Sequence, residues 1–186
     1  MEKNNYLVLL RGINVGGKNT IKMNELKKIF EEMKFSDIET YIQSGNVLFR
    51  DYENNRFKLT KKIEKKISDK LENEIKVAIL TLSEIKEIIN GVPNGFGKDS
   101  EKYKYDVIFL IEPLTTEDIM KELKIKQGKD KIYEGKKSIY VKRFAEKLTG
   151  SYISEILKIS QNITVRNLNT IKKIYELMLE RDCNIK

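Results

Sequence analysis

The hydrophobic positions at the start of the chain change period from one segment to the next. Residues 6–10 form an unbroken apolar run, which is typical of a strand buried on both faces. Apolar residues then recur at helical spacing and predict a helix over residues 23–34. Residues 38–43 and 47–50 read as two short strands. Only Ser44-Gly45-Asn46 separates them, which favours a hairpin.

A second helical pattern, with lysines on its outer side, covers residues 59–71, and a further strand is predicted over residues 75–81. The resulting order is β-α-β-β-α-β, the ferredoxin-like split βαβ motif. Residues 83–102 then interrupt the pattern with a short helix and a glycine-containing loop. This segment is the predicted boundary between two halves, residues 1–82 and residues 103–186.

The second half repeats the order of elements but not the residues. Its predicted elements are a strand at 103–111, a helix at 115–123, a hairpin of strands at 131–133 and 138–142, a helix at 151–159, a short strand at 163–165 and a last helix at 167–181. Thr115 is placed to cap the first of these helices together with Asp118. We therefore predict an α+β fold of two ferredoxin-like β-α-β-β-α-β halves packed together, each with an antiparallel-containing sheet.

The first strand makes a prediction about burial. Tyr6, Val8 and Leu10 point to one face, and Leu7 and Leu9 point to the other. The helices of a single ferredoxin-like half cover only one face of its sheet. We therefore expect the other face to be covered by the second half or by another chain.

Composition restricts the chemistry that this chain can perform. Its 186 residues have 36 Lys and Arg against 28 Asp and Glu, a net charge of +8, which suits phosphorylated ligands or nucleic acid as partners or else a solvated lysine-rich surface. The absence of His excludes imidazole catalysis and His-ligated zinc sites. A single Cys, Cys183, excludes disulfides and thiolate metal clusters within one chain. No cofactor is expected, and magnesium would be needed only if the chain is a transfer enzyme.

The sequence has no apolar run suited to a signal peptide or to a membrane span. We therefore expect a cytoplasmic protein that does not bind membranes. Its oligomeric state is not predicted.

The segment RGINVGGKNT, residues 11–20, has the G-x-x-x-x-G-K spacing of a phosphate-binding loop. Asn19 stands where that loop has Ser or Thr, and a hairpin follows the next helix, so we do not expect a nucleoside-triphosphatase loop. Glycines allow backbone amides to point one way and attract an anion, but they also build ordinary turns. The candidate ligand residues here are Arg11, Gly12, Asn14, Gly16, Gly17, Lys18 and Lys22.

The segment YIQSGNV places Tyr41, Gln43, Ser44 and Asn46 at a hairpin tip. If the first and third strands are antiparallel neighbours, this tip lies at the same end of the sheet as Arg11. The alternatives are a shared polar corner and a plain Ser-Gly-Asn turn.

The late segment VRNLNT offers a second candidate position. Arg166 and Asn167 precede the last helix, where Asn167 either caps the helix or helps Arg166 to bind an anion at the helix N-terminus.

Together these segments resemble a known bacterial family. LLRGINVGGKNTIKMNELKKIFEEMKF followed by TYIQSGNVLF is similar to the start of the domain of unknown function 1697 family, and ITVRNLNTIKKIYELM is similar to its T-x-R-N-x-N-T segment. Leu168 stands where many members carry Trp. The resemblance implies an α+β fold with ferredoxin-like halves and no particular activity.

Three classes of function follow from these observations. The first, which we favour, is a binding module for a phosphorylated ligand or nucleic acid that uses the glycine-rich basic loop. The second is a magnesium-dependent enzyme of phosphoryl or nucleotidyl transfer, which would need carboxylates near that loop. The third is a protein–protein interaction scaffold.

Overall fold

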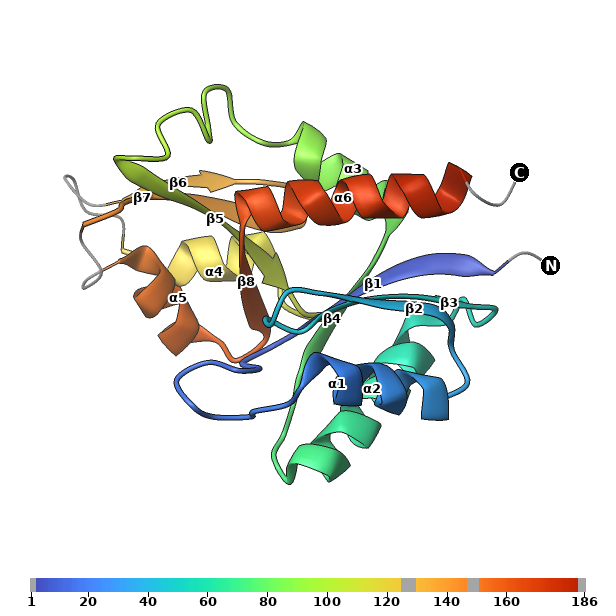
Figure 1. Cartoon of the computed structure of the whole chain (residues 1–186). Coiled ribbons are helices and arrows are strands. Elements are labelled where there is room, and N and C mark those ends of the chain that lie inside the picture. The colour runs from blue at the N-terminus through green and yellow to red at the C-terminus, as the bar shows by residue number, and fades with distance from the viewer. Residues whose placement is uncertain (1–2, 125–129, 147–150, 184–186) are drawn as a thin grey trace. The chain divides into compact units, whose positions relative to one another are not determined.

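The computed structural model of the chain describes residues 3–124, 130–146 and 151–183. These residues form two compact units, one from residues 3–85 and 174–183 and the other from residues 86–173 (Figure 1). Each unit contains a four-stranded antiparallel sheet.

The first unit has the order predicted from the hydrophobic pattern. Its elements are β1 (Asn4–Leu10), α1 (Met23–Glu32), β2 (Ser36–Tyr41), β3 (Asn46–Asp51), α2 (Arg56–Leu71) and β4 (Val77–Thr81). In the sheet the strand order is β2-β3-β1-β4, so β1 lies at the centre and pairs antiparallel with both β3 and β4. This is the strand order of a ferredoxin-like half.

A helix, α3 (Leu82–Asn90), follows β4 in the chain. The remaining elements are β5 (Tyr103–Leu110), α4 (Thr116–Glu122), β6 (Lys131–Glu134), β7 (Ser138–Phe144), α5 (Tyr152–Ile159), β8 (Ile163–Asn167) and α6 (Leu168–Cys183). Their strand order, β6-β7-β5-β8, repeats that of the first sheet. The predicted capping box is present, because Thr115 and Asp118 each accept a backbone hydrogen bond from the other. The α+β fold of two ferredoxin-like halves is thereby confirmed.

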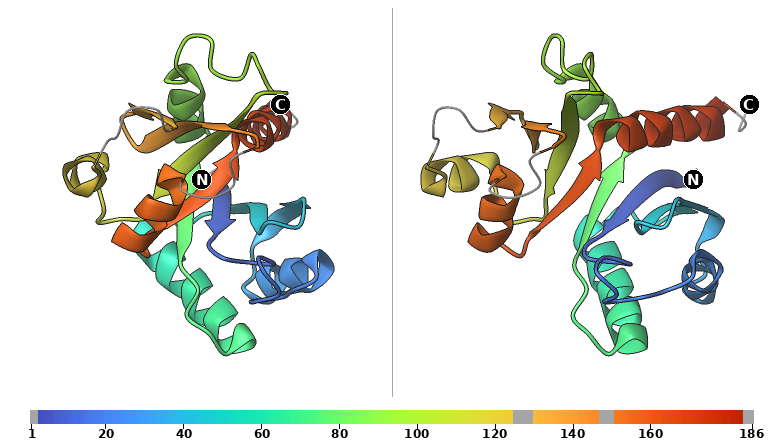
Figure 2. Two further views of the ribbon diagram at one scale, coloured as in Figure 1. Left: turned by 90° about the vertical axis from the view of Figure 1, so that its left-hand side faces the viewer. Right: turned by 60° about the vertical axis from the view of Figure 1, so that its left-hand side comes forward.

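Both faces of β1 are buried, as the apolar run predicts. Tyr6, Val8 and Leu10 belong to the core beneath α1 and α2, which lie on one face of the first sheet (Figures 1 and 2). Leu7 and Leu9 point to the opposite face and are fully buried as well.

The end of α6 is anchored to this opposite face. Asn5, on the same face as Leu7, donates from Nδ2 to the carbonyl of Met178 at 3.2 Å and to Asp182 Oδ1 at 3.0 Å. Its register partner Arg50 donates to the carbonyl of Arg181. Two sheet side chains therefore donate to carbonyls in the last turns of α6, and the carbonyl of Arg181 is one of the last four, which have no partner within the helix.

Arg50 and Arg181 extend this anchor into a charged network. Arg50 Nε lies 3.3 Å from Asp37 Oδ2. Arg181 donates to the carbonyl of Asp37 and lies 3.4 Å from Glu39 Oε2. Burial lowers the pKa of Arg181, and the neighbouring Glu39 opposes that shift. The network thus joins the end of α6 to β2 and β3 within the first unit.

The position of α6 differs from the predicted division of the chain. The sequence assigned all of residues 103–186 to the second half, whereas residues from Ile174 onward group with the first unit. The reason is the anchor just described, because its partners Asn5, Asp37 and Arg50 all belong to the first sheet.

The second unit covers its sheet differently. Ile108, Ile139 and Val141 form its core with residues of α4 and α5. On the other face the ring of Phe96 contacts Tyr105 and Tyr140, with the centroids 4.8 and 5.9 Å apart. The hydroxyl of Tyr140 donates to the carbonyl of Ile88 at 2.7 Å. In this unit a loop segment therefore packs where the first unit has a helix end.

The anchor leads to a prediction about stability. Arg50→Ala should lower the free energy of unfolding by about 2–3 kcal/mol, because it removes a charged donor to the carbonyl of Arg181 and the ion pair with Asp37. Urea denaturation monitored by circular dichroism measures this change. Lys70→Ala, which removes an exposed ion pair with Glu25, should hardly move the midpoint. Equal midpoints for the two variants would show that the anchor adds no stability.

Candidate functional site

The glycine-rich segment between β1 and α1 folds as a small hairpin. Val15 and Lys18 form an isolated antiparallel bridge, and the amide of Lys18 donates to the carbonyl of Val15 at 3.1 Å. The two residues between them, Gly16 and Gly17, have φ angles of 59° and 75°. Positive φ at both central residues is the type I′ turn, which glycine adopts without strain. Turn geometry therefore accounts for this glycine pair.

The surroundings of this hairpin are not those of a phosphate-binding loop of the nucleoside-triphosphatase type. In such a loop the helix begins at the Gly-Lys pair, whereas α1 begins at Met23. Asn19, in the position of the usual hydroxyl residue, has a structural role. It donates from Nδ2 to the carbonyl of Gly12 at 3.2 Å and accepts at Oδ1 from Asn73 at 2.8 Å.

Asn14 joins the hairpin to the β2–β3 turn. Its Nδ2 donates to the carbonyl of Gln43 at 2.8 Å and to the carbonyl of Ile21 at 3.0 Å. Its Oδ1 accepts from the amide of Ile21 at 2.8 Å. One side chain thus closes the loop on itself and fastens it to the neighbouring turn. We call residues 11–22 and 41–46 together the glycine corner.

Gly45 makes the second connection within the glycine corner. The amide of Leu10 donates to the carbonyl of Gly45 at 2.8 Å. A Cβ atom on Gly45 would lie 3.0 Å from Leu10 Cβ and 3.2 Å from Ile13 Cβ, and its φ is 69°. Asn46 is buried next to it, and its Nδ2 donates to the carbonyl of Tyr41 and to Ser44 Oγ, each at 2.9 Å. The two segments meet as the strand order predicts, and Asn46 supports the turn from inside.

One residue of the turn was misplaced by the sequence pattern. Alternation put Ile42 in a strand, but β2 ends at Tyr41 and Ile42 adopts a left-handed φ of 49°. A β-branched side chain rarely takes this conformation. Ile42 is 48% exposed, and Val15 in the hairpin is 65% exposed. The glycine corner therefore presents two aliphatic side chains as well as polar groups.

The charged residues of the glycine corner differ from those of the nearby helices. Arg11 is only partly exposed, whereas Lys18 and Lys22 are exposed. None of these three side chains has a hydrogen-bond or ion-pair partner among the residues that the structure describes. The corner thus keeps three cations that the described part of the chain does not neutralise.

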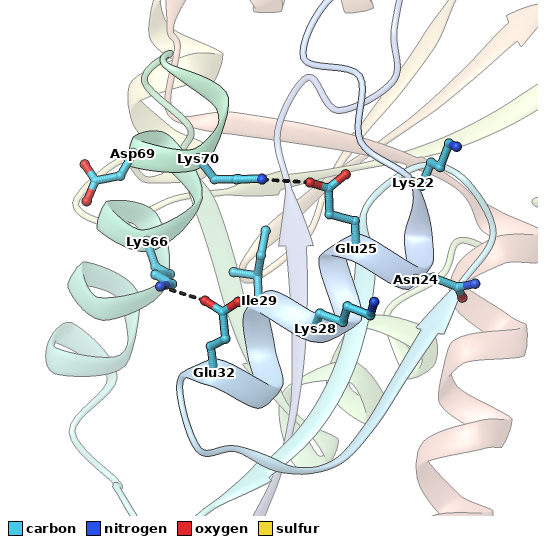
Figure 3. Close-up of a pocket in the computed structure, with 9 residues that line it drawn as sticks. All are labelled: Lys22, Asn24, Glu25, Lys28, Ile29, Glu32, Lys66, Asp69 and Lys70. Atoms are coloured by element: carbon cyan, nitrogen blue, oxygen red, sulfur yellow. Dashed lines mark ion pairs between the residues drawn. The ribbon is translucent and has the colours of Figure 1, made fainter.

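A groove of about 730 Å³ lies between α1 and α2, and Lys22 belongs to it as well as to the glycine corner (Figure 3). Two ion pairs cross it, Lys66 Nζ with Glu32 Oε2 at 2.8 Å and Lys70 Nζ with Glu25 Oε1 at 3.0 Å. The hydrogen bond from Lys66 lowers the pKa of Glu32, and the one to Glu25 raises the pKa of Lys70.

The hydrophobic pattern and the motifs of the sequence do not indicate this groove. Acidic residues along the first helix and lysines along the second are the only sequence features that relate to the groove. No local sequence pattern shows that these two helix faces lie opposite each other. The crossing pairs neutralise much of its charge, so the groove is a weaker candidate for an anion than the corner beside it.

Arg166 and Asn167 belong to the second unit and not to the unit that holds the glycine corner. Asn167 Oδ1 accepts from the amide of Asn169 at 2.9 Å, so the predicted helix cap is present. Arg166 is buried and donates to Thr164 Oγ1 and to the carbonyl of Val165, each at 2.8 Å. Burial lowers the pKa of Arg166 to about 10, which leaves it charged at neutral pH. Anion binding by Arg166 stays a prediction.

The described residues hold neither a metal-binding cluster nor a membrane-spanning helix. No group of three or more Asp, Glu or Cys side chains gathers there in a way that could hold a metal ion. None of the helices in those same ranges is long and apolar enough to cross a membrane.

Comparison with known proteins agrees with the fold and with the motifs. Among solved structures, the conserved bacterial protein SP0830 from Streptococcus pneumoniae is similar, with a TM-score of 0.79 and 26% identity over 95% of this chain and 99% of that chain. No curated protein matches the chain. The model of the family described as protein of unknown function (DUF1697) matches residues 3–140, a span that holds both segments of the glycine corner. Because that span is well over half of the chain, this protein belongs to the DUF1697 family.

Proposed function

We propose that this protein is a binding module and that its glycine corner holds the phosphate group of a phosphorylated small molecule or of a nucleic acid. One observation carries the proposal, the state of Arg11 at the end of β1. The residue is only partly exposed, yet no described residue provides its side chain with an acceptor. Arginine that is shielded from water is normally paired, because an unpaired charge is costly to desolvate.

The other arginines of the first unit follow that rule. Arg50 pairs with Asp37, Arg56 with Glu84 and Arg181 with Glu39. Arg11 differs from all of them, and an anionic ligand would give it the partner that the described chain does not. A guanidinium suits phosphate in particular, because its N–H groups match two phosphate oxygens.

The rest of the glycine corner is consistent with an anion. Lys18 and Lys22 add exposed positive charge on either side of Asn19. The amides of Gly16 and Gly17 lie at an exposed tip and donate to no other described residue. Asn14 and Gly45 hold the two segments of the corner together. The backbone that carries the cations is therefore already ordered, and binding costs less conformational entropy. No comparable observation favours magnesium-dependent transfer.

Melting curves test the proposal. Inorganic phosphate, ATP with magnesium and a short single-stranded RNA should each be added to the full chain, with sodium chloride at equal ionic strength as the control. A ligand at 100 times its Kd stabilises the fold by about 2.7 kcal/mol, and each kcal/mol raises the Tm of a chain of this size by about 2–4 °C. Arg11→Gln and Lys18→Ala should reduce the rise in Tm, whereas Lys65→Ala, an exposed lysine on α2, should not.

The three additives also separate the two sources of phosphate. A rise with phosphate or ATP assigns a small ligand, and a rise with RNA alone that Arg11→Gln reduces assigns nucleic acid to the glycine corner. If no anion exceeds the salt control, or if Arg11→Gln responds as the unaltered protein does, the glycine corner is a turn and the proposal is wrong. Magnesium-dependent hydrolysis of ATP would instead assign the enzyme function.

Glycine substitutions test how tightly the glycine corner is packed. Gly45→Ala should destabilise the fold by about 2–3 kcal/mol, because a left-handed φ adds strain and the new Cβ contacts Leu10 and Ile13. Gly16→Ala is the matched control. It also has a positive φ but has no atom within 4 Å of its Cβ, so it should cost only about 1 kcal/mol. Urea unfolding compares the two, and equal losses would show that the packing at Gly45 is not tight.

A further inference from the structure

The second sheet carries an aromatic surface that the glycine corner does not involve. In the pairing of β5 with β7, Tyr103 lies opposite Phe144 and Tyr105 lies opposite Lys142. These four side chains share one face of the sheet. Ile108, Ile139 and Val141, from the intervening positions, point to the opposite face and into the core with α4 and α5.

The two outer rings are in contact. The centroids of Tyr103 and Phe144 are 5.0 Å apart with an interplanar angle of 42°. Lys142 Nζ lies 3.8 Å from the centroid of Tyr103 and 5.7 Å from that of Tyr105. We call Tyr103, Lys142 and Phe144 the aromatic platform.

Exposure distinguishes the platform from the rest of this sheet face. Tyr105 is 4% exposed and packs against Phe96, so it belongs to the covered inner part. Phe144 is 39% exposed, and Tyr103 and Lys142 are partly exposed. An exposed phenylalanine supported by a second ring is costly to leave in water and well suited to stacking.

The chemistry of the platform selects its ligand. A nucleobase has a π-face that stacks on an aromatic ring, and the adjoining phosphate suits a lysine at the edge of that ring. Lys102 is exposed beside the platform, where its carbonyl accepts from the amide of Ala145 at 2.9 Å, and it adds positive charge. In a duplex the base faces are stacked and hidden, so only a single strand offers all of these groups.

We propose that the aromatic platform binds single-stranded nucleic acid, with one base stacked on Phe144 and a neighbouring phosphate on Lys142. RNA-binding modules with four-stranded sheets of this order also stack bases on aromatic side chains at the sheet surface. The inference goes beyond the function proposed for the glycine corner and does not rest on it. The platform lies in the other unit, and separate variants address the two sites.

The experiment measures fluorescence anisotropy of a labelled single-stranded RNA of about 12 nucleotides, a length within the usual site sizes. The full chain is titrated at about 50 mM salt and again at about 200 mM salt, because phosphate contacts weaken with salt. Phe144→Ala should raise Kd about tenfold. Phe144→Leu keeps an apolar side chain without a stacking ring and should raise Kd similarly, whereas Phe144→Tyr should preserve affinity.

Further variants assign the charge and control for exposure. Lys142→Ala should raise Kd and lower the slope of log Kd against log salt by about one. Phe57→Ala removes another exposed aromatic, 69% exposed on α2, and should leave Kd unchanged. Circular dichroism melts confirm that each variant is folded. If Phe144→Ala does not fold, the Kd of Phe144→Leu shows whether the ring of Phe144 is needed for binding.

Four outcomes would overturn the proposal. They are no binding of the single strand at low salt, unchanged Kd in Phe144→Leu, equal affinity for a duplex of the same sequence, and loss of binding in Lys18→Ala but not in the platform variants. The last outcome would place the nucleic acid at the glycine corner alone. Sedimentation adds one more: a dimer that Phe144→Leu dissociates would assign the platform to a second copy of the chain.

Discussion

The central strand β1 has to be buried on both faces, and much of the first unit depends on that constraint. Its five consecutive apolar residues place apolar side chains on both faces, and exposing either face to water would be unfavourable in free energy. Helices α1 and α2 cover one face, as in any ferredoxin-like half. Asn5 and Arg50 place the end of α6 on the other, through hydrogen bonds to carbonyls in the last turns of that helix.

The same constraint shapes the glycine corner. Because β1 is central and β3 is its neighbour, the turn before β3 lies directly against the end of β1. A Cβ atom on Gly45 would lie 3.0 Å from Leu10 Cβ and 3.2 Å from Ile13 Cβ, so a side chain there would have to displace its neighbours. The corner is therefore a consequence of strand order and packing, and its glycines are needed for backbone geometry. Strand order and packing do not account for its cations, and among them Arg11 is the partly exposed one that lacks an acceptor in the described part of the chain.

The two units share one topology but expose different surfaces. In the first, the face away from α1 and α2 is buried and joined to the end of α6. In the second, Phe96 covers only the inner aromatic residues, and Phe144 remains 39% exposed. A repeated fold thus supports two unrelated candidate sites, one at a loop corner and one on a sheet face. Fold alone would predict neither of them, because sites depend on particular side chains.

The sequence by itself determined the order of elements, the two antiparallel hairpins and the helix caps at Thr115 and Asn167. These features follow from local periods and from short-range hydrogen bonds, which a few neighbouring residues specify. Only the tertiary structure decided that Asn14 bonds to Gln43, that Ile42 turns left-handed and that α6 ends on the first sheet. It also decided which lysines face acids across a groove and that Arg11 faces none in the described part of the chain. Those outcomes depend on contacts between residues far apart in sequence, whose partners are selected by packing and by the desolvation of charge rather than by any local pattern.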